Sequence, residues 1–229
     1  MLHFKIKYIT VKRFLDIVFS IIGIILAIPI FLIVAIAIKI NSRGPIIFKQ
    51  KRIGKDGKVF EIYKFRTMVV GAEKTGTGVY SKKGDSRVTK VGNFLRMTSI
   101  DEFPQFFNIL KGEMSFIGPR PVLTYHPWEF KEYTAMQLKR FNVKPGITGW
   151  AQIHGRKDVP WDERIKLDVY YVDNISFIMD LKIMIKTVAN VILMKDNVNS
   201  ENKTAISNKV EVELEKECSN QNDNTNVYN

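Results

Sequence analysis

Two adjacent carboxylates, Asp101 and Glu102, follow a basic and polar stretch and precede a proline. If a helix begins near Asp101, Pro104 falls in its first turn, where proline is tolerated, and both carboxylates lie at the helix N-terminus. The helix dipole there stabilises ionised carboxylates and attracts phosphate. Two such groups can divide the chemistry between a nucleophile and a Mg²⁺ ligand. A structural interpretation competes, because Ser99 and Glu102 have capping-box spacing, and from these residues alone it is the stronger one.

Cationic side chains that suit a diphosphate occur in two short motifs. Strand alternation across residues 63–68 places Lys64 and Arg66 on one face. In the Gly-Pro-Arg-Pro sequence at 118–121, each proline holds the residue before it extended, which fixes the direction of the Arg120 guanidinium and suits bidentate binding of phosphate. Taken singly, the two motifs fit a solvated edge strand and a surface turn better.

Several other kinds of site find no support in the sequence. His126 and His154 are isolated, no Cys/His spacing predicts zinc, and neither a P-loop nor a Gly-x-Gly-x-x-Gly motif occurs. The single cysteine, Cys218, excludes a disulfide framework within the chain and fits a reducing compartment.

The charge of the chain is divided unevenly. The net charge is +12, but residues 196–229 carry −4 and residues 1–195 carry +16. A body this basic is expected to bind anionic partners, which could be nucleic acid, an anionic membrane surface or phosphorylated substrates. Residues 196–229 are rich in asparagine and poor in large apolar side chains, so we expect them to be disordered and acidic.

An uncharged apolar run over residues 17–38 predicts a membrane helix. At ~1.5 Å per residue it would reach roughly 33 Å, about the thickness of a hydrocarbon core. Both flanks are basic, which would keep both ends on the cytoplasmic side. Pro29 lies within the run and favours a kink. A re-entrant helix and a tilted, Pro-kinked spanning helix both remain open.

The remainder predicts an α+β fold that is mostly helical, with a short antiparallel sheet. We expect a hairpin from the runs 46–48 and 59–68 around a turn at 54–57. A mobile loop at 71–85 and a second loop at 144–156 are expected between regular elements. The expected helices are 101–110, 127–141, 161–172 and 175–195. The chain thus divides into a basic N-terminal segment with a membrane helix (1–41), a catalytic domain (42–195) and a tail (196–229).

The last expected helix is amphipathic. It places Lys182, Lys186 and Asn190 on one stripe among apolar side chains. A helix lying in the membrane interface and a helix packed on the domain core both fit this pattern, and alone the second fits slightly better.

Five motifs in a fixed order, together with the proline-broken apolar helix, carry a resemblance to a known family. They are Tyr-Lys-Phe-Arg-Thr-Met (63–68), Arg-x-x-Ser-x-Asp-Glu (96–102), Asn-Ile-Leu-Lys-Gly-Glu-Met-Ser-Phe-Ile-Gly-Pro-Arg-Pro (108–121), Lys-Pro-Gly-Ile-Thr-Gly-Trp-Ala-Gln (144–152) and Leu-Asp-Val-Tyr-Tyr-Val (167–172). Over about residues 10–195 the chain closely resembles the bacterial sugar transferases, the monotopic polyprenyl-phosphate phosphoglycosyl transferases, in their minimal short form.

The resemblance implies a re-entrant, Pro-kinked membrane helix and a small cytoplasmic domain resting on interfacial amphipathic helices. It implies transfer of a sugar phosphate from a UDP-sugar to polyprenyl phosphate with release of UMP, at the cytoplasmic face of the cytoplasmic membrane, as the first membrane step of a bacterial glycan pathway. Membrane lipids are then partners, and nucleic acid is not.

The resemblance also assigns roles to single residues. Asp101 matches a nucleophile that forms a covalent aspartyl-phosphosugar intermediate, and Glu102 matches the Mg²⁺ ligand. The basic and acidic positions that it places around the phosphates are Lys64, Arg66, Arg96, Arg120 and Asp168.

Two other functions remain open. A membrane-bound hydrolase would cleave the UDP-sugar with water, and a non-enzymatic module would bind anionic membrane surfaces through its charge alone. The sequence does not give the sugar, the pathway or the oligomeric state.

Overall fold

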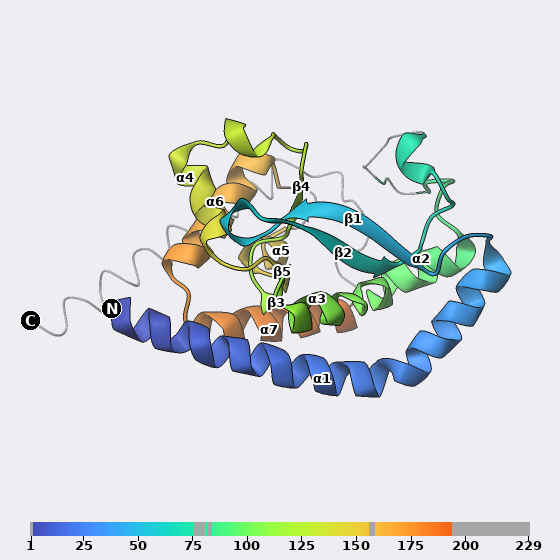
Figure 1. Cartoon of the computed structure of the whole chain (residues 1–229), viewed down its shortest axis with the longest axis horizontal. Coiled ribbons are helices and arrows are strands. Elements are labelled where there is room, and N and C mark those ends of the chain that lie inside the picture. Colours follow the sequence, from blue (N-terminus) through green and yellow to red (C-terminus); the bar gives the residue numbers. More distant parts are fainter. Residues whose placement is uncertain (1, 76–80, 82–83, 156–158, 194–229) are drawn as a thin grey trace, which may run out of the picture.

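The computed structural model describes residues 2–75, 81, 84–155 and 159–193, and most of these residues are helical. The longest helix, α1, spans Leu2–Asn41 and contains Pro29. It runs along one side of the molecule and bends beyond its midpoint, so that its last part rises toward the sheet (Figure 1). Among the described residues, this is the one helix long and apolar enough to cross a membrane. The expected long apolar helix near the N-terminus is therefore confirmed.

One face of α1 packs on the rest of the protein along most of its length. Five buried side chains mark this face: Asp16, Ser20, Ala27, Val34 and Ile38. Their spacings are close to one or two helical turns, so they form a single stripe that continues on both sides of Pro29. At Gly23 the backbone of α1 comes close to α3 (Gln105–Lys111), because an added Cβ would lie 2.9 Å from the ring of Phe106.

Polar contacts fix the first half of α1 to the domain. Arg13 donates from Nη1 to the carbonyl of Ile109 (2.6 Å) and from Nη2 to that of Leu110 (3.0 Å), at the C-terminal end of α3. Oδ1 of Asp16 accepts from the N–H of Phe116 (3.1 Å). The helix is thus held by directional bonds as well as by apolar packing.

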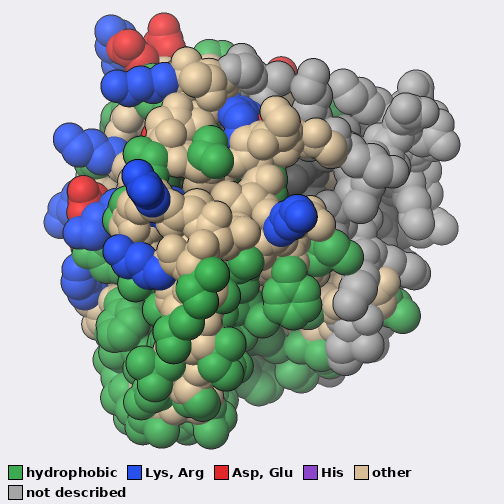
Figure 2. Space-filling model, turned by 90° about the vertical axis from the view of Figure 1, so that its right-hand side faces the viewer, with side chains coloured by type: hydrophobic (Ala, Val, Ile, Leu, Met, Phe, Trp, Pro, Cys, Tyr) green, Lys and Arg blue, Asp and Glu red, His purple; other side chains and the backbone are tan. Residues whose placement is uncertain are grey.

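The opposite face of α1 is apolar and exposed. Its exposed large side chains include Phe19, Leu26, Ile33 and Ile40, the last at 83%. α7 (Phe177–Ile192) adds further exposed apolar side chains: Ile178, Leu181, Ile185 and Val188. Figure 2 shows hydrophobic side chains gathered at the lower end of one face, on the side where α1 lies in Figure 1, with Lys and Arg side chains above them. The expected amphipathic helix over 175–195 is confirmed for the residues that α7 covers.

A buried carboxylate joins α7 to α1 and to α6 (Trp161–Asp173). Asp180 Oδ2 accepts from the hydroxyl of Tyr8 and pairs with Nζ of Lys12, both at 2.5 Å, while its Oδ1 accepts from the hydroxyl of Tyr171 at 2.8 Å. Because this carboxylate of α7 is bonded to two side chains of α1, the exposed apolar faces of the two helices are fixed relative to each other.

The expected hairpin is present. β1 (Ile47–Ile53) pairs antiparallel with β2 (Val59–Phe65), and β4 (Val122–Leu123) adds to the other edge of β1, so the order is β2-β1-β4. The turn contains a short 3-10 segment, η1 (Lys55–Gly57), in which Gly57 has a φ of +73°. The small antiparallel sheet predicted from the sequence is confirmed.

A second pair of strands was not predicted. β3 (Ser115–Ile117) and β5 (Gly146–Thr148) pair in parallel, and three residues each are too few to give a periodic pattern. Glycines permit this pairing, since a Cβ on Gly146 would lie 2.1 Å from the backbone nitrogen of Gly118. The expected loop at 144–156 is therefore wrong in part, because it contains β5 and α5 (Trp150–Ile153).

The single helix expected over 127–141 is also wrong. That stretch forms three short elements: η4 (Phe130–Glu132), α4 (Ala135–Leu138) and η5 (Lys139–Asn142). Glu129 and Thr134 are each the N-cap of a capping box, so two separate helical segments begin where one helix was expected. The expected loop at 71–85 includes η2 (Ala72–Lys74), and 76–80 and 82–83 lie outside the described residues, as does the tail.

Candidate functional site

The two adjacent carboxylates lie on a short 3-10 turn, η3 (Ile100–Glu102), which leads directly into α3. Pro104 precedes α3 with helical torsion angles, and Gly112 ends that helix with a φ of +85°. The helix predicted to begin near Asp101 is therefore confirmed in outline. The capping-box interpretation is wrong, because the Ser99 side chain makes no cap hydrogen bond and its backbone is left-handed, with a φ of +58°.

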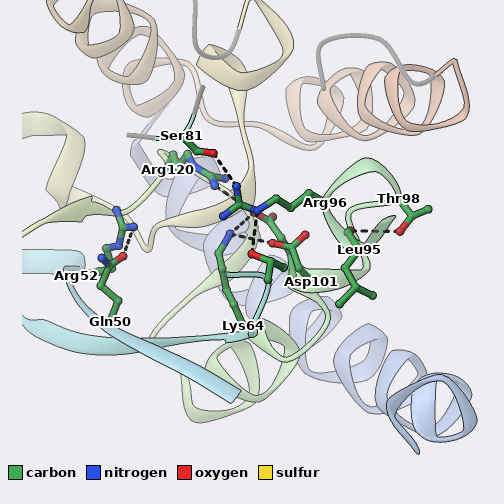
Figure 3. A network of polar contacts seen from close by, with 11 residues as sticks. Gln50, Arg52, Lys64, Ser81, Leu95, Arg96, Thr98, Asp101 and Arg120 are labelled. Carbon is green, nitrogen blue, oxygen red and sulfur yellow. Dashed lines mark hydrogen bonds and ion pairs between the residues drawn. The ribbon is translucent and has the colours of Figure 1, made fainter. Parts of the chain in front are cut away.

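Lys64 on β2 lies between the two carboxylates. Its Nζ is 2.6 Å from Oε1 of Glu102 and 3.8 Å from Oδ2 of Asp101. Arg120 approaches the same oxygen of Glu102, with Nη2 at 3.1 Å, while about half of its side chain stays exposed. In Figure 3, Lys64, Arg96 and Arg120 converge on Asp101 from different elements. The structure thus brings together five of the seven residues that the sequence singled out.

Burial and charge act differently on the two carboxylates. Asp101 is only 9% exposed, and burial raises its pKa, with Lys64 acting against this rise and the charge of Glu102 adding to it. Burial opposes ionisation of Glu102 as well, but Lys64 and Arg120 together outweigh it and hold the pKa of Glu102 below its ordinary value. The site therefore contains one firmly ionised carboxylate beside a more basic one.

Arg96 is held in place by α2 (Lys90–Met97), which the sequence analysis did not predict. Its Nε donates to the hydroxyl of Thr67 and its Nη1 to that of Ser81, both at 2.8 Å. α2 lies unusually close to Thr67, because a Cβ on Gly92 would be 1.9 Å from the Thr67 carbonyl oxygen. The charge of Arg96 favours the ionised form of Asp101.

Arg66 lies apart from the carboxylates. β2 ends at Phe65, so strand alternation no longer governs the next residue. Arg66 is 5% exposed, and its Nη2 donates to the carbonyl and the hydroxyl of Ser42 at 2.8 and 2.9 Å. It thereby ties the chain beyond the C-terminal end of α1 to the strand that carries Lys64.

Asp168 also lies apart from them. It is 2% exposed on α6, and its Oδ2 accepts from Nε (3.2 Å) and Nη2 (2.6 Å) of Arg140. Nη2 of Arg140 donates further to the backbone carbonyl of Arg120 at 3.0 Å. Arg140 was not predicted from the sequence, and no local signal marks it, since its buried partner lies 28 residues away.

The donor set fits Mg²⁺ only with help from a substrate. No cluster of three or more His, Cys, Asp or Glu side chains occurs among the described residues. Mg²⁺ is commonly bound by one or two carboxylates together with water and substrate phosphates, which the pair Asp101 and Glu102 can supply in part. Since Lys64 and Arg120 both contact Oε1 of Glu102, its Oε2 is the better placed atom for a cation.

Comparisons with known proteins agree with these features. Residues 7–194 match the family described as bacterial sugar transferase. Galactosyl transferase CpsE of Streptococcus agalactiae is 42% identical over 84% of this chain and 44% of its own length. A UDP-glucose:undecaprenyl-phosphate glucose-1-phosphate transferase of Klebsiella pneumoniae is 45% identical over 77% of this chain and 39% of its own. The uncharacterized sugar transferase EpsL of Bacillus subtilis is 47% identical over 72% of this chain and 77% of its own length. The chain therefore spans less than half the length of the first two relatives.

Proposed function

The chain belongs to the bacterial sugar transferase family, and on this basis we propose that it moves a sugar 1-phosphate from a UDP-sugar to polyprenyl phosphate, releasing UMP. One observation carries the proposal to this chain. A buried carboxylate, Asp101, is surrounded by Lys64, Arg96 and Arg120, so that a nucleophile and the charges that bind a diphosphate share one site.

In the proposed first step, an oxygen of Asp101 bonds to the phosphorus that carries the sugar. The bond from that phosphorus to the bridging oxygen breaks, and UMP leaves with the bonding electrons. In the second step an oxygen of the lipid phosphate attacks the same phosphorus and releases the Asp101 carboxylate. Covalent catalysis thus divides the transfer and lets UMP depart before the lipid reacts.

The electrostatics of the site suit these steps. Burial raises the pKa of Asp101 and so makes it a better nucleophile, while the charge of Lys64 acts against this rise and favours the ionised form. Negative charge builds on phosphate oxygens as UMP leaves, and fixed cations such as Arg120 stabilise that charge in place. A Mg²⁺ ion held by Glu102 would add charge stabilisation of the same kind.

We further propose that α1 is re-entrant and that the site lies at the cytoplasmic face of the inner membrane. The buried stripe on α1 runs from Asp16 to Ile38, so the helix packs on the domain on both sides of Pro29. A helix packed in this way does not stand alone across a bilayer. Its exposed apolar face, continued by α7, would enter one leaflet, and basic residues flank the apolar run 17–38 on both sides.

The test is UMP release from a panel of UDP-sugars with polyprenyl phosphate and Mg²⁺, for the wild type and Asp101→Asn. We expect lipid-dependent UMP with at least one donor and none above background in the variant. Asp173→Asn is a matched control, because the same change falls on a half-exposed carboxylate paired with Lys139. UMP formed equally without lipid would favour the hydrolase, and no UMP with any donor would favour the non-enzymatic module.

The covalent intermediate needs its own experiment. Wild-type protein incubated with a sugar-labelled donor and no lipid acceptor should retain the label, and hydroxylamine should release it, because acyl phosphates react with hydroxylamine. The Asp101→Asn protein should retain none. Labelled product formed with acceptor at full rate, but no retained label under any quench, would argue for direct transfer instead.

A further inference from the structure

Three consecutive backbone carbonyls of the Pro-Arg-Pro segment are each held by a donor from another element. The carbonyl of Pro119 accepts from the N–H of Gly146 at 2.9 Å. The carbonyl of Arg120 accepts from Nη2 of Arg140 at 3.0 Å, and that of Pro121 accepts from Nη1 of Arg52 at 3.1 Å. Two of these three donors are guanidinium groups rather than backbone N–H groups.

The segment depends on such donors for its position. The proline on each side of Arg120 lacks an N–H group, so this stretch cannot form a continuous ladder of backbone bonds. The rest of the protein therefore fixes this segment mainly by donating hydrogen bonds to its carbonyl oxygens. Holding them sets the direction in which the Arg120 side chain leaves the backbone toward Oε1 of Glu102.

Arg140 is suited to hold the segment because it is itself fixed. Its side chain is 2% exposed, and two of its nitrogens bind Oδ2 of Asp168, whose side chain is 3% exposed. Nη2 donates both to that carboxylate and to the Arg120 carbonyl. The orientation of the guanidinium that Asp168 fixes is therefore also the one that binds the Arg120 carbonyl. A planar fork with fixed donor directions makes this possible, whereas a lysine ammonium would not.

We propose that Arg140, oriented by Asp168, is a positioning residue that holds Arg120 in reach of Glu102 and of the substrate phosphates. This role rests on the proposed function, in which Arg120 binds the phosphates. Asp168 then acts through Arg140 and does not touch the substrate, unlike the role that the family resemblance implied for it.

The test replaces the buried pair as a unit. Arg140→Met combined with Asp168→Leu removes both charges and keeps the volume similar, and such replacements of a buried ion pair often leave stability nearly unchanged or raise it. The first readout is hydrogen exchange of peptides covering 118–123, which needs no activity. We expect exchange there at least about tenfold faster, with β1 and α6 unchanged.

The second readout is a double-mutant cycle with Arg120→Ala. The pair variant alone should slow transfer at least about tenfold, but less than about twofold in the Arg120→Ala background, because Arg120 is no longer there to be positioned. A purely structural role would slow transfer equally in both backgrounds. Lys139→Ala, a neighbouring change that removes an ion pair with half-exposed side chains, is the control and should leave both readouts unchanged.

Each result decides the proposal. Unchanged exchange over 118–123, or rate losses that multiply in the cycle, would overturn it. If the pair variant does not fold, Arg140→Lys enters the same measurements, since it keeps the charge facing Asp168 but loses the fork. If the wild type transfers no sugar with any donor, the proposed function fails, and the exchange result alone decides whether Arg140 holds the segment.

Discussion

The side chain of Asn108 closes the free edge of β2, the strand that carries Lys64. β2 lies at the edge of the sheet, so one side of its backbone has no neighbouring strand. Asn108 is fully buried. Its Oδ1 accepts from the N–H of Tyr63 (3.0 Å), and its Nδ2 donates to the carbonyl of Glu61 and to Oε2 of Glu113 (both 2.7 Å). One amide thus replaces the pairing that a further strand would give.

Replacing Asn108 with leucine should therefore cost much more stability than its size suggests. Three hydrogen bonds at about 1 kcal/mol each give roughly 3 kcal/mol, and the two β2 backbone groups left without partners raise the expected loss to about 3–5 kcal/mol. Glu113→Ala removes only one of the three bonds and leaves both backbone groups paired. We expect it to cost about 1 kcal/mol.

Urea unfolding in detergent micelles measures both variants, and hydrogen exchange at the Tyr63 amide reports the edge directly. We expect faster exchange in Asn108→Leu and little change in Glu113→Ala. Transfer activity should also fall in Asn108→Leu, because Lys64 follows Tyr63 on the same strand. A loss below about 1 kcal/mol with unchanged exchange at Tyr63 would refute the edge-closing role.

Three further predictions concern the site and the membrane face. Lys64→Met removes a charge that counteracts the effect of burial, so the pKa of Asp101 rises. In the proposed mechanism Asp101 reacts as the carboxylate, so the acidic limb of kcat/KM against pH should move to higher pH. Gly92→Ala adds a Cβ that would lie 1.9 Å from the Thr67 carbonyl, so α2 must shift with Arg96, and transfer should slow without loss of membrane binding. Ile33→Asp places a charge on the exposed apolar face, and vesicle flotation should show binding weakened about tenfold or more.

Each of these changes has a matched control. Lys49→Met removes an exposed lysine paired with Glu61 on the hairpin, and the acidic limb should stay in place. Asn93→Ala alters the exposed neighbour of Gly92 and should leave the rate unchanged. Val59→Asp adds a carboxylate at an exposed apolar position of β2 and should not affect flotation. If test and control variants behave alike, the corresponding assignment is wrong.

The elements that the sequence predicted correctly have strong local signals. The hairpin has a glycine-containing turn between β-prone runs, and α3 has a proline before it and a glycine after it. The single helix predicted over 127–141 was wrong. The apolar spacing of these residues fits a helix, but the capping side chains of Glu129 and Thr134 each begin a new short helical segment. Local pattern could not rank these competing signals.

The residues at the centre of the candidate site were singled out from the sequence, whereas the residues that hold them in position were not. Asp101, Glu102 and Arg120 were assigned to the site through the family resemblance, because their motifs taken singly fit a helix cap and a surface turn better. Arg140 and Asn108 act through partners distant in the chain, and neither residue type in its local context signals a buried role. Arg66 was expected beside Lys64 because alternation was extended by one residue beyond the end of β2.

α3 connects the membrane helix with the proposed nucleophile. Its C-terminal carbonyls bind Arg13 of α1, and its N-terminal end follows directly from Asp101 and Glu102. At ~1.5 Å per residue this places Asp101 on the order of 10 Å from the Arg13 contact. Arg66 ties the chain beyond the other end of α1 to the strand of Lys64. Both partners of the Asp101–Lys64 pair are thus linked to α1 or to the residue after it, so in the proposed membrane arrangement the depth of α1 would also set the height of the site above the lipid.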